Sequence, residues 1–505
     1  MLSRTSTFNR VASTRLVVLA CLLFSLVPVA VAQTAAQAPA PEAVARAREV
    51  FEVAMNFAGD GKMREALGPA EEAVGLFEKA FGPDHEELIG PLVVASNMRR
   101  DVGDLRGAEA PLLRALAIAE RRLGEDNKLT CTVLNNTGVL YRMLGMYGNA
   151  RPFYERALAA RKRVLGPEAE DTGQSHTNLG ILLREIGEYE SASTHLRRGA
   201  DIAERWYGFN HPTTGVSIGT LAMLANSQGN YSEADRLYRR ALEIHEKTLG
   251  PEHRTTLITL NNLANFLVST GAYDEALPLL ERLLETRMKI FGPEHPETLA
   301  AIANFGSLFA VRGDAARARP LYERALEIGK KLYESDSDKL ARAYLAMANL
   351  ELIEGRLDAA ESNVRTALEI REKQLGLDNP NAAACLATLG SIYLARKDFA
   401  SARSYLERAV AIDVRTLGPE HPTSVSALRA WGELLWATGR TADAVDVQRR
   451  ANDARERELI RNLTTGSEQR KLSYLELTAD ELDRTISLHQ FAATSNATAA
   501  RAALE

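Results

Sequence analysis

The sequence has little cysteine and no excess of basic residues. Three cysteines in 505 residues are too few for a disulfide-stapled scaffold or a cysteine-rich zinc framework. The 61 lysines and arginines are outnumbered by 66 aspartates and glutamates, which gives a formal net charge of -5. Proteins that bind nucleic acids draw much of their affinity from neutralising phosphates, so we predict no nucleic-acid partner. With 46% hydrophobic and 25% charged residues, the composition is that of a folded globular protein.

Long apolar runs are also absent, except at the N-terminus. Residues 16–31 read LVVLACLLFSLVPVAV, follow three arginines, and end at a small-x-small cleavage motif. This order predicts a secretory signal peptide at 1–32, cleaved after Ala32, and therefore an exported protein, periplasmic or secreted. The alternative is that this segment is retained as an N-terminal anchor. No other stretch approaches the roughly 20 apolar residues of a membrane span. Residues 33–41 form an Ala/Pro-rich spacer.

A 42-residue repeat organises the rest of the chain. A loop glycine recurs at this period, with one double step in which Glu334 takes its place, and a second glycine column is interrupted only by Lys397. Small residues at a fixed place in every repeat indicate that two helices cross closely there. One column is alanine throughout: Ala66, Ala108, Ala150, Ala192, Ala234, Ala276, Ala318, Ala360, Ala402 and Ala444. Another is small throughout: Ala54, Ser96, Gly138, Gly180, Ala222, Ala264, Gly306, Ala348, Gly390 and Gly432.

One repeat shows the local structure that the pattern predicts. Residues 256–270 read TLITLNNLANFLVST, with apolar residues at helical spacing, and Gly271 ends this helix. A second helix is predicted at 273–290, and Gly292 ends it. A helical hairpin of this size cannot bury its apolar face alone, so neighbouring copies must stack to form a core.

The repeat resembles the tetratricopeptide repeat, in which a small residue, a glycine and an alanine recur at these intervals. The 42-residue period and the phrases NNLA and LGPEHP narrow the resemblance to the long repeats of kinesin light chains and their bacterial relatives. The resemblance implies an all-α fold, a right-handed α-solenoid of about ten hairpins over 42–462. It weakens at Arg99, Glu351 and Thr441, where expected apolar or aromatic residues are replaced.

The C-terminal segment 463–505 carries a second resemblance. Its phrases GSEQRKLSYL and ISLHQF look like the joint that precedes a caspase-like CHAT domain in bacterial proteins with repeats of this type. The resemblance implies that this chain is the repeat half of such a protease, without its catalytic half. The alternative is a helical cap or linker, with a helix at 471–491.

The histidines do not have the spacing of a metal site. Five of them follow the loop glycine by three residues, on hairpins about 10 Å or more apart, so one ion with ligands at about 2 Å cannot gather them. We expect them to help start the next helix, and we predict no metal and no cofactor. These histidines are His85, His211, His253, His295 and His421.

No motif predicts catalysis, so we predict that the chain is not an enzyme. Residues 215–219 match the G-x-S-x-G pattern of hydrolases, but that motif needs a strand-to-helix turn, and here it falls in a predicted helix. Cys131 and Cys385 lie six repeats apart, and we expect both to be free buried thiols. Charged residues along the helices are expected to form solvated faces.

The predicted function is that of a non-catalytic scaffold that binds a protein or extended peptide in the concave groove of the repeats. By resemblance to kinesin light chains, asparagines two residues before the small column contact the partner, since an amide both donates and accepts hydrogen bonds. The alternative is that they bond to neighbouring helices. Positions that form a cationic carboxylate clamp in other such proteins are mostly neutral here. No oligomeric state is predicted. The predicted peptide-binding residues are Asn136, Asn178, Asn262, Asn304, Arg142 and Arg184.

Overall fold

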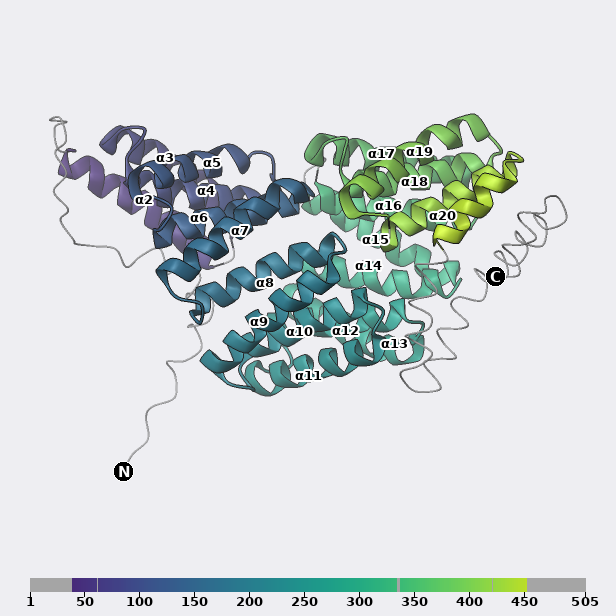
Figure 1. Ribbon diagram of the computed structural model, residues 1–505, viewed down its shortest axis with the longest axis horizontal. Helices are drawn as coiled ribbons and strands as arrows, with labels where there is room; N and C mark the ends of the chain where they lie inside the picture. The colour runs from purple at the N-terminus through teal and green to yellow at the C-terminus, as the bar shows by residue number, and fades with distance from the viewer. Residues whose placement is uncertain (1–38, 61, 334–336, 420, 452–505) are drawn as a thin grey trace, which may run out of the picture. The chain divides into compact units, whose positions relative to one another are not determined.

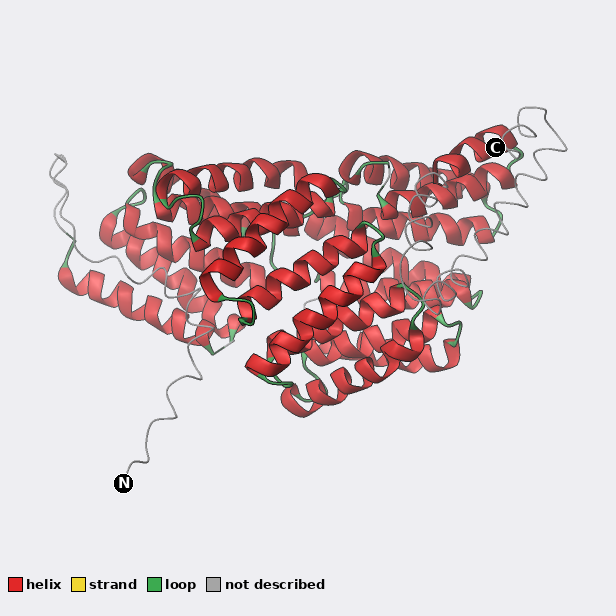
Figure 2. Cartoon of the chain, turned by 60° about the horizontal axis from the view of Figure 1, so that its bottom comes forward, coloured by secondary structure: helices red, strands yellow, loops and turns green. Residues whose placement is uncertain are grey.

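The structure is a computed structural model that describes residues 39–60, 62–333, 337–419 and 421–451. The predicted signal peptide lies outside the described residues, and so does the C-terminal segment that resembles the protease joint. Within the described residues all regular structure is helical and there is no strand (Figure 2), so the predicted all-α repeat fold is confirmed. No helix of this part of the chain has the length and apolar character needed to cross a bilayer.

The helices follow the 42-residue period of the sequence. From α8 to α20, each first helix of a hairpin starts 42 residues after the previous one. Residues 441–451, which follow α20, are also helical. The elements, labelled in Figure 1, are α2 (Pro41–Gly59), α3 (Met63–Phe81), η1 (Glu86–Leu88), α4 (Ile89–Val102), α5 (Glu109–Leu123), α6 (Lys128–Met143), α7 (Tyr147–Val164), α8 (Glu170–Glu185), α9 (Tyr189–Tyr207), α10 (Pro212–Ser227), α11 (Tyr231–Leu249), α12 (Arg254–Ser269), α13 (Tyr273–Phe291), α14 (Pro296–Val311), α15 (Ala315–Leu332), α16 (Asp338–Ile353), α17 (Leu357–Leu375), α18 (Pro380–Ala395), α19 (Phe399–Leu417) and α20 (Pro422–Ala437).

The chain divides into two compact units. Unit 1 comprises Met1–Leu144 and Pro152–Val164, and unit 2 comprises Gly145–Arg151 and Leu165–Glu505. From α2 to α5 and from α8 to α19, the two helices of each hairpin pack together, and the second helix of each also packs against the first helix of the next hairpin. The core therefore runs along the stack, as expected where each hairpin buries its apolar face on its neighbours.

The two small-residue columns lie where the helices of a hairpin cross. All ten residues of the alanine column are fully buried. At Gly138, an added Cβ would lie 2.8 Å from the ring of Tyr154, and at Gly390 it would lie 2.4 Å from Cγ of Leu406. A larger side chain at these positions would push the two helix axes apart, so the columns set the close crossing that the sequence predicted.

Glycine ends most of the first helices because the chain adopts a positive φ there. Gly271 and Gly355 have φ values of 78° and 74°, which residues with a Cβ rarely adopt. After α18 this place is taken by Lys397, with φ 62°, the one non-glycine residue of positive φ among the described residues. The single interruption of the glycine column therefore marks a strained turn.

Candidate binding face

The first helices of unit 2 lie on the inner side of the stack. Successive first helices approach each other closely at α8–α10, α12–α14, α14–α16 and α16–α18, and successive second helices show no comparable approach in the described part of the unit. The side on which the repeats lie closest together is the inside of the curve. We call the surface made by α10, α12, α14, α16 and α18 the inner face.

Two of the predicted asparagines lie on successive first helices of the inner face. Asn304 on α14 donates a hydrogen bond from Nδ2 to Oδ1 of Asn261 on α12, at 2.6 Å. The side chain of Asn262, partly exposed beside them, makes no hydrogen bond within the described residues. Asn304 therefore bonds to a neighbouring helix, which was the alternative interpretation, whereas the amide of Asn262 is available for a partner.

The other predicted residues lie on first helices outside α10–α18. Asn178 and Arg184 are on α8, where Arg184 Nη1 donates to Ser227 Oγ of α10 at 3.3 Å and Nη2 pairs with Glu185 at 3.7 Å. Asn136 and Arg142 are on α6, which belongs to unit 1. The side chain of Arg184 is 17% exposed, so it links two helices more than it faces solvent.

Sequence reasoning missed part of this face. Thr388 Oγ1 on α18 donates to Oδ1 of Asn349 on α16 at 3.1 Å, a further side-chain link between successive first helices. Four large apolar side chains of these helices are exposed: Val216 by 49%, Ile258 by 43%, Val311 by 50% and Ile353 by 67%. A comparison of equivalent repeat positions would have revealed them, because each pair has the same register in adjacent repeats.

Comparison with protein families identifies the repeat. Residues 92–163, 129–205, 255–331, 299–373, 339–413 and 389–457 match one description of the tetratricopeptide repeat, and residues 214–255 match another. Together the matched segments cover more than half of the chain. The chain belongs to the tetratricopeptide repeat family.

Solved structures of such repeats are also similar to this tetratricopeptide chain. A putative kinesin light chain with nearly identical TPR-like repeats from Podosopora anserina is 26% identical, with 41% of this chain and 99% of that one covered and a TM-score of 0.34. BtubC from P. vanneervenii is 21% identical over 46% and 92% of the two chains, with a TM-score of 0.36. A Rap protein complexed with competence and sporulation factor is 14% identical over 83% and 99%, with a TM-score of 0.47. A comparison with curated proteins gave no match.

The loop histidines of the tetratricopeptide array cap helices. In each case Nδ1 accepts a hydrogen bond from the backbone N–H two residues later, at 3.3 Å for His85, 3.1 Å for His295 and 3.2 Å for the other three. Three of the rings also stack on the aromatic residue that precedes the loop glycine, as His211 does on Tyr207, with ring centroids 4.5 Å apart. These contacts confirm that the histidines help to start helices. No group of three or more metal-ligating side chains occurs in the described residues.

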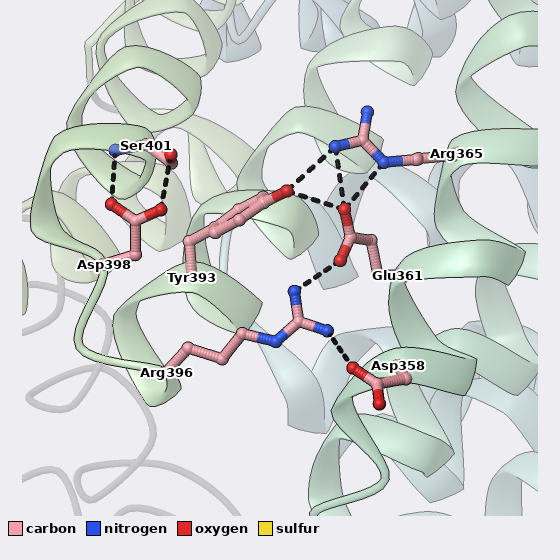
Figure 3. Close-up of polar contacts among 7 residues, drawn as sticks. All are labelled: Asp358, Glu361, Arg365, Tyr393, Arg396, Asp398 and Ser401. Carbon is pink, nitrogen blue, oxygen red and sulfur yellow. Dashed lines mark hydrogen bonds and ion pairs between the residues drawn. The ribbon is translucent and has the colours of Figure 1, made fainter.

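A polar cluster joins the tetratricopeptide hairpin α16–α17 to the next one (Figure 3). Glu361 of α17 accepts hydrogen bonds from Tyr393 Oη at 2.6 Å, from Arg365 Nε at 2.8 Å, and from Arg396. The hydrogen bond from Tyr393 and those from the two guanidinium groups lower the pKa of Glu361 to about 2. Arg396 also binds Asp358, at 2.5 Å. Because each charge has a partner, the cluster fastens two hairpins together, and Glu361 stays ionised near neutral pH.

The G-x-S-x-G match, the buried His245 and the two cysteines are all part of the helical packing. Ser217, the serine of the G-x-S-x-G match, lies within α10 and donates to the carbonyl of Thr213 at 3.2 Å. His245 is buried, with ring nitrogens 2.8 Å from Thr259 Oγ1 and 3.0 Å from the carbonyl of Pro212. Cys131 and Cys385 are free and buried, as predicted, and burial raises the pKa of both thiols.

Proposed function

We propose that this protein is a non-catalytic scaffold whose inner face binds an extended segment of a partner protein. Membership of the tetratricopeptide family supports a role in protein interaction. The observation that carries the proposal is the juxtaposition, on one face, of an available amide at Asn262 and exposed apolar side chains such as Ile258. An amide can satisfy both polar groups of a peptide bond, and apolar contact supplies affinity.

Asn262 tests this proposal because its side chain has no hydrogen-bond partner in the part of the chain that the structure describes. In Asn262→Ala we expect partner capture by the mature chain to fall severalfold while the melting temperature stays unchanged, since one hydrogen bond of about 1 kcal/mol is lost only in the complex. Asn149→Ala removes an exposed amide of the second helix α7 and serves as the matched control. Capture by pull-down and melting by circular dichroism are the measurements. Equal capture by both variants, or a melting change in Asn262→Ala, would contradict the assignment.

We propose that the chain is exported through its N-terminal signal. The basic start, the apolar run and the cleavage motif over residues 1–32 support this proposal. Expression of the full chain, cell fractionation and N-terminal sequencing test it, and a mature N-terminus at Gln33 is expected. A cytoplasmic product that retains residues 1–32 would contradict it.

A second candidate function is the sensor half of a caspase-like protease. The phrases GSEQRKLSYL and ISLHQF, which look like the joint before a CHAT domain, favour this candidate. Reading the gene downstream of the codon for Glu505 separates the two. A continuing frame with a histidine and a cysteine in a strand-rich segment would support the protease, and a stop codon in an intact gene would count against it.

A further inference from the structure

Most helices of the inner face carry almost no charge. Neither α10 nor α18 contains Asp, Glu, Lys, Arg or His. Arg254 of α12 and Glu297 of α14 are the only charged residues of those two helices, both lie in the first turn, and they pair at 3.4 Å. Ion pairs gather on the second helices and the loops after them, for example Arg239–Glu275 at 2.6 Å. The inner face from α10 to α14 is therefore close to neutral, although a quarter of the whole chain is charged.

The exposed apolar side chains share this face with the amides. Ile258 lies four residues before Asn262, and Ile353 lies four residues after Asn349, so each apolar side chain is on the same side of its helix as an amide. Each of these isoleucines has an exposed apolar counterpart at the equivalent position of the preceding repeat. Val216 precedes Ile258 by 42 residues, and Val311 precedes Ile353 by 42 residues.

The two apolar pairs lie at opposite ends of their helices. Val216 and Ile258 are near the N-terminal ends of α10 and α12, whereas Val311 and Ile353 are at the C-terminal ends of α14 and α16. These registers differ by eleven residues, or about 16 Å along the helix axis at 1.5 Å per residue. The amides of Asn261, Asn262 and Asn304 lie between the two ends. The face thus presents an apolar site, a polar middle and a second apolar site along a diagonal across four first helices.

We infer that the inner face of unit 2 selects an uncharged, extended peptide segment with apolar side chains toward both of its ends. This inference rests on the proposed function and specifies the chemistry of the partner. The diagonal extends across three helix spacings of about 10 Å each and about 16 Å along the helix axes. An extended peptide of roughly ten residues, at about 3.3 Å per residue, spans this distance. A charged side chain would lose water on the face from α10 to α14 and find no unpaired opposite charge there, so desolvation disfavours acidic and basic segments over these three helices.

Three pools of fluorescein-labelled synthetic decapeptides test this inference with the mature chain. One pool is uncharged, with Val, Ile, Leu or Phe near both ends and Ser, Gly or Thr between. In the acidic pool Asp and Glu replace the Ser, Gly and Thr residues, and in the basic pool Lys and Arg replace them. Fluorescence anisotropy should show at least about tenfold tighter binding of the uncharged pool, the equivalent of about 1.4 kcal/mol. Binding of that pool should also be insensitive to salt, because no ion pair forms.

Two variants place the binding on the inner face. Ile258→Asp and Ile353→Asp should each weaken binding of the uncharged pool at least about tenfold, since each puts an unpaired charge at an apolar end. The matched control is Ile290→Asp, which changes an isoleucine of the second helix α13 that is 41% exposed, and it should bind as the wild type does. Circular dichroism checks that each variant is folded. If Ile258→Asp melts early, the milder Ile258→Ser takes its place.

The outcomes separate this inference from the proposed function. Binding of the uncharged pool that is lost in the inner-face variants supports both. Tighter binding of a charged pool, lost in the same variants, overturns the inference and leaves the proposed function standing. If no pool binds, or if only Ile290→Asp reduces binding, both the inference and the proposed function fail.

Discussion

At the scale of single residues, Lys397 shows how a repeat position constrains its occupant. It occupies the helix-ending place that glycine holds in neighbouring repeats, with a φ of 62°. A residue with a Cβ in this region is strained by about 1–2 kcal/mol. Lys397→Gly should therefore stabilise the protein by about 1 kcal/mol, measured as a higher midpoint in urea unfolding.

Gly355, which ends α16 one repeat earlier, supplies the control for Lys397. Its φ is 74°, and an added Cβ would meet no atom within 4 Å. Gly355→Ala should thus destabilise by a similar amount through backbone strain alone. A neutral Gly355→Ala together with a neutral Lys397→Gly would show that these turns carry no strain.

Asp413 predicts a specific pH dependence. It is buried at a position where other repeats place Arg161, His245, Arg287 or Arg371, and its Oδ1 has no hydrogen-bond partner within the described residues. Burial raises its pKa from 3.8 to about 7. The carboxyl group is therefore protonated in the fold up to about pH 7. The stability it contributes is complete below pH 3.8 and is lost as the pH rises through 7.

Asp413→Asn removes this ionisation while keeping the shape. At pH 8 the variant should be more stable than the wild type, by at most about 4 kcal/mol for a shift of about three pKa units. The difference should shrink toward zero at about pH 4. Thermal melting at both pH values measures it, and an equal difference at both values would refute a buried ionisable Asp413.

At the scale of elements, the small-residue column decides how closely two helices of a hairpin cross. Gly390 on α18 and Gly432 on α20 occupy the same repeat position, but their surroundings differ. A Cβ at Gly390 would lie 2.4 Å from Cγ of the fully buried Leu406, whereas at Gly432 the nearest atom, in Val447, would be 3.6 Å away.

The two glycines make a matched pair of substitutions. Gly390→Ala should destabilise the protein by about 1–3 kcal/mol, because the buried leucine has no space into which to move. Gly432→Ala should stabilise it by up to about 1 kcal/mol, because alanine favours the helix. Urea unfolding of both variants gives the sign, and stabilisation of both would mean that the crossing relaxes freely.

At the scale of the whole molecule, the hairpins contact mainly their neighbours, so their stability should be local. In Gly390→Ala, amide protection in hydrogen exchange should fall in α18 and α19 and in the adjacent α17 and α20. Protection in α10–α12 should remain as in the wild type. A uniform loss of protection over α8–α20 would show instead that unit 2 opens as one body.

Much of the fold was predictable from the sequence because its signals are local. Helix ends, close crossings and the hairpin period depend on residues within about 42 positions of one another, and the structure confirms them at the alanine column and the histidine caps. The individual roles of the asparagines were less accessible. Asn262 and Asn304 occupy equivalent positions, yet one amide is available and the other bonds to Asn261, because that contact depends on which residue the neighbouring helix presents.

The amino-acid sequence by itself determined that this chain builds helical hairpins of constant length that must stack, since apolar periodicity and small-residue spacing leave no other way to bury the core. Only the tertiary structure decided which distant residues meet. The turn at Gly187 lies against the loop before α20, where a Cβ on that glycine would be 3.5 Å from the carbonyl of Leu417 and 3.9 Å from the ring of His421. Burial there and the nearby charge of Arg184 lower the pKa of His421 to about 4. The physical reason is that small rotations between neighbouring hairpins add up over many repeats, and no single repeat encodes their sum.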